Sequence, residues 1–171
     1  MAQLNDLNID GANIIFPNFS GTPDQFNKSG KRIFNVVIDN DDDAEQLAND
    51  GWAVKIRQGN ENYDPYKFIK CELQFMADNP NVRMDPEVYL ITVRSNGSKS
   101  QVKLDANTVG TLDGLFKQRM VKHVDLTLTP YHWKTDLGEG VKAYAKYIYV
   151  TADTNVWADK YSDDNTDEVP F

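Results

Sequence analysis

Apolar and polar residues alternate along much of the chain, as they do in β-strands with one buried face. In 66–75, for example, Ile69, Cys71 and Leu73 fall on one face and mostly polar residues on the other. Asn96-Gly97 is a hairpin signal between two such segments. We predict strands over 12–16, 32–39, 52–58, 66–75, 87–94, 100–104, 120–133 and 141–152.

Helix is predicted in one place only, over the acidic segment 41–50. Asp42 and Glu45 have capping-box spacing, and Gly51 suits the left-handed position after a helix. We expect the first ten residues to be loose, and 105–116 to be a turn with at most one helical turn. Short strands separated by turns indicate a mainly all-β protein, either a small barrel or a sandwich, and their spacing does not choose between these.

A chain of 171 residues has the size of one domain with appendages, and we divide it into a body over 1–151 and a tail over 152–171. It lacks an apolar run of about 18 residues and begins without the pattern of a signal peptide, so we expect no membrane span. Its single cysteine, Cys71, excludes an internal disulfide and suits a reducing cytoplasm. Cys71 lies on an apolar strand face, so we expect it in the core.

The formal net charge of −8 is distributed unevenly. Residues 152–171 contain six acids and one base (−5), and residues 39–50 contain six acids and no base (−6). The remaining residues contain 17 bases and 14 acids, a net charge of +3. The overall acidity therefore does not exclude a body that binds nucleic acid.

The sequence contains few residues in patterns typical of catalytic or metal sites. His123 and His132 have no partners at ligand spacing, so we expect no metal, no cofactor and no catalytic residues. Acids at positions 39, 41, 43 and 50 match part of a calcium loop, but Ala44 stands where that loop requires glycine. The same acids could hold Mg²⁺ in a nuclease, an alternative that we keep open.

Basic and aromatic residues are interleaved on several predicted strands. Such surfaces bind single-stranded nucleic acid, because bases stack on the rings while cations meet the phosphates. On the last strand, Lys142, Tyr144 and Lys146 alternate on the face opposite Tyr147 and Tyr149, which we assign to the core side. The candidates are Lys28, Lys31, Arg32, Lys55, Arg57, Tyr131, Trp133, Lys142, Tyr144 and Lys146.

The tail is acidic and without periodicity, so we expect it to be disordered. A tail that served only solubility would not need the apolar ending Val-Pro-Phe. An aromatic ring beside the terminal carboxylate suits an apolar pocket with a basic rim on a partner protein. The residues that we expect to bind a partner are Asp163, Asp164, Asp167, Glu168, Val169, Pro170 and Phe171.

These residues resemble the acidic C-terminal tip of bacterial and phage single-stranded DNA-binding proteins, in which several acids precede Ile-Pro-Phe. The body looks like a group of small phage proteins in the segments "NFSG", "FNKSGKRIF", "DGWAVK" and "VDLTLTPYHW…GVKAYAKYIYVT". The resemblance implies an oligonucleotide-binding (OB) barrel that binds single-stranded DNA (ssDNA), and a location in the cytoplasm of the infected bacterial host.

In that family the tail recruits replication and repair enzymes and competes with DNA for the basic groove. The resemblance thus implies a non-enzymatic protein of phage replication or recombination, with a polymerase, helicase or primase as partner. The sequence leaves open whether the protein forms a homo-oligomer. The remaining alternatives are a phage structural β-sandwich and the metal-dependent nuclease.

Overall fold

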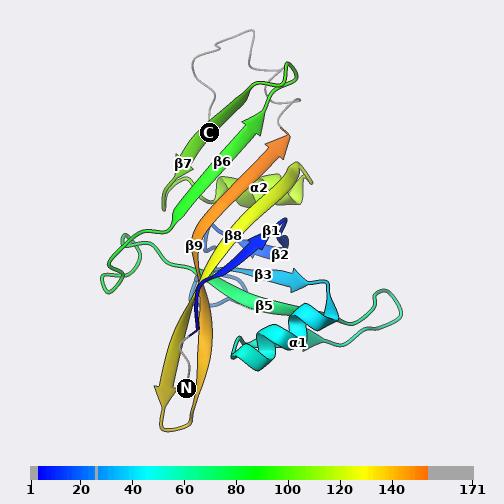
Figure 1. Ribbon diagram of the computed structural model, residues 1–171. Coiled ribbons are helices and arrows are strands. Elements are labelled where there is room, and N and C mark those ends of the chain that lie inside the picture. Colours follow the sequence, from blue (N-terminus) through cyan, green and yellow to red (C-terminus); the bar gives the residue numbers. More distant parts are fainter. Residues whose placement is uncertain (1–3, 26, 154–171) are drawn as a thin grey trace.

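The computed structural model describes residues 4–25 and 27–153, which form one curled sheet with two helices (Figure 1). The strands are β1 (Leu7–Asp10), β2 (Asn13–Asn18), β3 (Arg32–Ile38), β4 (Val54–Arg57), β5 (Tyr66–Leu73), β6 (Glu87–Val93), β7 (Lys99–Leu104), β8 (Val121–Thr135) and β9 (Gly138–Asp153). The helices are α1 (Asp41–Asp50) and α2 (Thr111–Lys117). The predicted mainly β class is confirmed, and the curled sheet is consistent with an OB-like fold.

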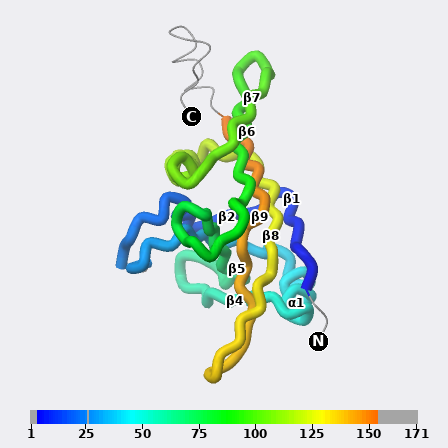
Figure 2. The backbone as a smooth tube through the Cα atoms, turned by 90° about the vertical axis from the view of Figure 1, so that its left-hand side faces the viewer, coloured from blue at the N-terminus to red at the C-terminus, as the bar shows by residue number. Residues whose placement is uncertain are grey.

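Two long strands organise the sheet, whose main path is β1-β8-β9-β5-β3-β2. Figure 2 shows the β8–β9 pair running the length of the molecule, from β6 and β7 at one end to a projecting hairpin at the other. Both β5 and β6 pair with β9 in parallel, whereas β3 and β4 pair with β5 in antiparallel fashion.

The core follows the apolar face of each strand. Ile69, Cys71 and Leu73 of β5 are buried, as their alternation predicts. They pack in one cluster with Phe34 of β3 and Leu128 of β8, to which α2 and the other strands add further side chains. Cys71 is fully buried in this cluster, so the expectation that it is a core residue is confirmed, and its burial raises the pKa of the thiol.

Helix α1 has the predicted bounds, but its cap differs from the prediction. Asn40, and not Asp42, is the N-cap, and its side chain accepts a hydrogen bond from the Asp43 N–H at 3.0 Å. Gly51 ends the helix at φ 117°, as predicted. The acidic segment therefore forms a helix start and not the loop that a calcium site needs.

Three expectations about local structure were wrong. Residues 7–10 form β1, which pairs with β8, and 111–117 form the helix α2. In β9 a bulge at Lys146 reverses the alternation, so Ile148 is buried and Tyr147 faces outwards.

None of the helices in residues 4–25 and 27–153 is long and apolar enough to cross a membrane.

Candidate nucleic-acid interface

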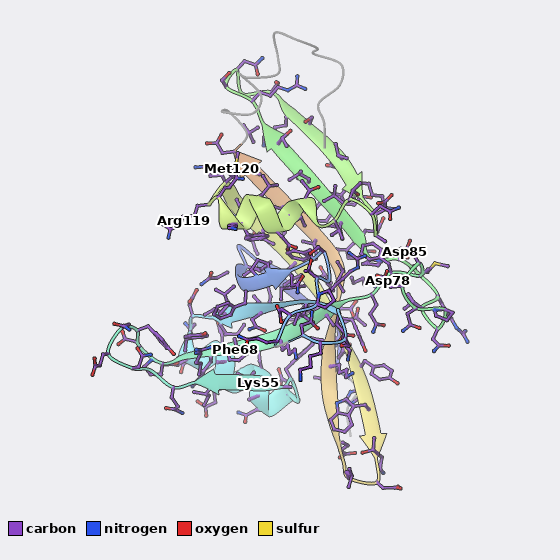
Figure 3. All side chains as sticks on the ribbon, turned by 180° about the vertical axis from the view of Figure 1, so that it is seen from behind. Lys55, Phe68, Asp78, Asp85, Arg119 and Met120 are labelled. Carbon is purple, nitrogen blue, oxygen red and sulfur yellow. The ribbon has the colours of Figure 1, made fainter. Side chains whose placement is uncertain are left out.

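The register of β3, β4 and β5 brings cations and aromatic rings onto one side of the sheet. Directly paired residues project to the same side, and Lys55 pairs with Phe68 while Arg57 pairs with Tyr66. Because Ile69 and its inward neighbours on β5 face the core, these four residues face outwards. Figure 3 shows Phe68 and Lys55 near one another, away from Arg119 and Met120 at the end of α2.

This outer face lines a groove of about 1610 Å³. Side chains from β2, β3, β4 and β5 form its wall, and α2 adds Phe116 and Lys117 at one side. The cations and exposed or half-buried rings of the groove are Phe16, Lys55, Arg57, Tyr63, Tyr66, Phe68, Lys70, Phe116 and Lys117. Of these, only Lys55 and Arg57 were predicted from the sequence.

The missed rings form a chain along the groove. Tyr63 and Tyr66 have centroids 6.2 Å apart, and Tyr66 and Phe68 have centroids 5.8 Å apart, both in tilted geometry. A signal for two of them was present in the sequence. Tyr66 and Phe68 occupy the polar face of a strand whose opposite face is apolar, as Tyr144 does in the predicted strand 141–152.

Arg57 is held in place by two rings. Its Nε–H donates to the Tyr63 hydroxyl oxygen at 2.9 Å, and its guanidinium carbon lies 5.6 Å from the Tyr63 centroid and 6.0 Å from the Phe16 centroid. The hydrogen bond with Tyr63 raises the pKa of Arg57 above its ordinary value. The guanidinium is thus a fixed positive charge at this end of the groove.

The same outer face continues onto the β8–β9 hairpin. Tyr144 of β9 pairs with Glu72 of β5, so it projects on the side of Lys70 and Phe68. Tyr131 lies edge-on to Tyr144 with centroids 5.9 Å apart. Burial, followed by the nearby Glu72 carboxylate and Tyr131, raises the pKa of Tyr144.

The remaining hairpin candidates, Lys142 and Trp133, also belong to this face. Lys142 is exposed and pairs with Tyr131, which lies two residues from Trp133 on β8. The indole lies over Gly140 so closely that a Cβ at that glycine would come within 2.8 Å of it. Trp133 therefore packs its ring against Gly140 of the neighbouring strand.

Two candidates precede β3. Lys31 lies 3.8 Å from Glu72 on the outer face, and its side chain is half exposed. Lys28 is exposed in the loop before β3, next to Asn27, which lines the groove.

Arg32 lies on the opposite side of the sheet, because it pairs with the inward-facing Leu73. Its side chain is only 12% exposed, and its guanidinium contacts Asp78 at 2.7 Å. It also donates to the carbonyl oxygens of Phe19 (2.7 Å) and Ala106 (2.9 Å). These contacts join β3 to the loops that contain Phe19, Asp78 and Ala106, so Arg32 does not face the groove.

Lys146 occupies the bulge of β9 and lies apart from the groove. Its ammonium contacts Asp6 at 3.2 Å and lies 5.6 Å from the Tyr147 centroid. The bulge explains why the uninterrupted alternation placed it beside Lys142 and Tyr144.

His123, for which the sequence shows no partner at metal-ligand spacing, lies between two carboxylates. Its Nε2 is 2.8 Å from Asp125 and 2.9 Å from Asp10 of β1. Hydrogen bonds with Asp125 and then Asp10 raise the pKa of His123. The contact of His123 with Asp10 could not be read from the sequence, because β1 was not predicted, whereas Asp125 lies two residues away on the same strand.

The predicted partner-binding residues Asp163–Phe171 lie outside the described residues, so the structure adds nothing to them.

The chain resembles three solved structures of the single-stranded DNA-binding protein of bacteriophage Enc34, one of which is a complex with ssDNA. That complex has 9% identity and a TM-score of 0.48, and covers 86% of both chains. Single-stranded DNA-binding protein gp2.5 of bacteriophage T7 has 14% identity and a TM-score of 0.35 over 98% of this chain and 97% of its own.

A separate search of curated proteins finds no match to the sequence. A protein family described as "Putative phage ssDNA-binding domain" matches residues 1–169, nearly the whole chain. The chain therefore belongs to this family of phage single-stranded DNA-binding domains.

Proposed function

We propose that the protein binds ssDNA along the outer face of β3, β4 and β5, with the β8–β9 hairpin extending the contact. The observation that carries the proposal is the interleaving of rings and cations on one sheet face, with Tyr66 and Phe68 beside Lys55 and Lys70. Ring faces accept unpaired bases of any type, while lysines contact phosphates, so binding is largely independent of sequence.

The proposed interface should bind single strands more tightly than duplex. The bases of a duplex are stacked on one another and cannot reach a ring on a flat strand face. Stacking contributes about 1–3 kcal/mol per base, which is lost when the ring is removed. A duplex would gain only the phosphate contacts, which depend steeply on salt.

Phe68→Ala tests the proposal, with fluorescence anisotropy of a labelled oligo-dT as the readout. We expect the dissociation constant to rise roughly 5- to 150-fold, the equivalent of one lost stack. Tyr89→Ala is the matched control, because Tyr89 is a half-buried ring that stacks on Tyr149 on β6 and β9, away from the groove. Equal losses in the two variants, or tighter binding of duplex than of single strand, would refute the proposed interface.

We further propose that the protein acts in phage DNA replication or recombination and that residues 152–171 recruit a replication protein. The tail has a net charge of −5 and the body has basic residues on the groove, so the two attract one another at low salt. DNA would displace the tail from the groove and leave Val169-Pro170-Phe171 available to a partner.

Deletion of residues 163–171 tests the tail. We expect the truncated protein to bind oligo-dT more tightly at low salt and equally at high salt, because screening removes the competition. It should also lose co-purification with the phage polymerase, helicase or primase. Weaker binding of oligo-dT by the truncated protein would contradict the competition.

A further inference from the structure

Phe16 has a backbone conformation that bulky residues rarely adopt. Its φ is 50°, in the left-handed region, and it is followed by Pro17. The pairing of β2 with β3 is interrupted between Ile15 and Asn18, so Phe16 lies in a bulge. Strain of this kind persists only where the surrounding structure imposes it, and it is concentrated at functional sites.

Packing does not explain the strain. The Phe16 side chain is 62% exposed, so little apolar surface is removed from water. Phe19, three residues later, is by contrast a core residue. It is fully buried, and the centroids of the Phe19 and Phe34 rings are 5.1 Å apart in a stacked arrangement. Among residues 4–25 and 27–153, the one cation–π partner of the Phe16 ring is Arg57, and no other ring stacks on it.

The strained bulge places this ring at the groove, beside the chain of aromatic residues. Arg57 bridges the two, since its guanidinium lies near both Phe16 and Tyr63. The Arg57 guanidinium contacts the Phe16 and Tyr63 rings from the space between them. The rest of each ring is therefore open to a flat ligand of about the size of an aromatic ring. An unpaired nucleobase has this shape, and Arg57 supplies a charge for the adjoining phosphate.

We infer that Phe16 is a base-stacking residue, and that the bulge in β2 holds its ring in solvent for this purpose. The inference rests on the proposed function and adds a contact that lies on β2, outside the row of rings on β5. The strained backbone is the cost of presenting an aromatic ring at a position where packing does not require one.

Three variants at this position separate a binding role from a folding role. Phe16→Gly removes the ring and relieves the left-handed backbone, Phe16→Ala removes the ring and keeps the strain, and Phe16→Tyr keeps both. Ile56→Ala is the control, because Ile56 is similarly exposed, at 57%, on β4. The readouts are oligo-dT affinity by anisotropy and the melting temperature without DNA.

We expect Phe16→Gly and Phe16→Ala to raise the dissociation constant roughly 5- to 150-fold, and Phe16→Tyr and Ile56→Ala to stay within about twofold of the wild type. We also expect Phe16→Gly to melt at a higher temperature than Phe16→Ala.

Binding by Phe16→Gly within twofold of the wild type would overturn the inference. If Phe68→Ala still weakened binding, the proposed function would survive that result, whereas wild-type binding by both variants would refute both proposals. If Phe16→Tyr lost as much affinity as Phe16→Gly, the inference would also be overturned, because the tyrosine ring should stack on a base as the phenylalanine ring does.

Discussion

Removal of Lys55 and Lys70 together is the sharpest test of the electrostatic part of the interface. The two lysines flank Phe68, since Lys55 pairs with it across β4 and β5 and Lys70 follows it by two residues. Both are exposed, and neither has an ion pair among the described residues. Their replacement by alanine should therefore leave the fold intact.

The expected effect follows from counterion release. Each neutralised phosphate of a single strand contributes about 0.7 to the slope of log affinity against log salt, so two lost contacts lower that slope by about 1.4. The contribution of counterion release to the affinity is taken as zero at 1 M salt. A slope lower by about 1.4 then means that the double variant binds roughly 25-fold more weakly than the wild type at 0.1 M salt.

Lys99→Ala with Lys103→Ala is the matched control, because both lysines are exposed on β7, distant from the groove. Each double variant lowers the formal net charge from −8 to −10, so they differ only in where the charge is lost. The assay is oligo-dT anisotropy at several salt concentrations. The same slope of log affinity against log salt in the two double variants would show that binding follows net charge and not the outer face of β4 and β5, and would refute the proposed phosphate contacts.

Three further predictions concern the parts around the interface. Arg32→Ala should destabilise the fold by about 2–4 kcal/mol in urea titrations, because it leaves a carboxylate and two carbonyl oxygens without their donor, and a purely DNA-binding Arg32 would leave stability unchanged. Asp10→Asn should lower the pKa of His123 measured by NMR. The folded pKa is raised, so the stabilising contribution of His123 is complete below about pH 6.5 and is lost as the pH rises through the folded pKa. Gly140→Ala should shift the indole N–H resonance of Trp133, since a Cβ there would displace the ring; an unchanged resonance would contradict the contact.

Strand assignment depended on local pattern and was therefore accessible from sequence. Tyr66–Leu73 and Glu87–Val93 were predicted with bounds that differ by one or two residues, because each has an apolar face with a clear period of two. β1 was missed because its four residues gain their pairing only from β8, which is more than a hundred residues away in the chain.

The candidate site was predicted unevenly for a related reason. Lys55, Arg57 and Tyr144 lie on the outer face, because exposure of one strand face follows from burial of the other. Arg32 was grouped with Lys31 although the two side chains lie on opposite sides of the sheet. The first residue of a strand can be assigned to a face only when its partner on the next strand is known, which for Arg32 is Leu73. Lys146 was grouped with the wrong residues because a bulge leaves no mark in the apolar pattern.

The sequence by itself determined the mainly β class, the helix at 41–50, the buried face of β5 and the concentration of acidic residues in 39–50 and 152–171. Each of these depends on residues close together in the chain or on their charge. Only the tertiary structure decided which strand faces join into one surface, because the pairing of Glu72 with Tyr144 connects segments about seventy residues apart. It also decided that Phe16 stands in solvent at the groove, because a backbone angle within a bulge depends on the partner strand and not on the residue itself.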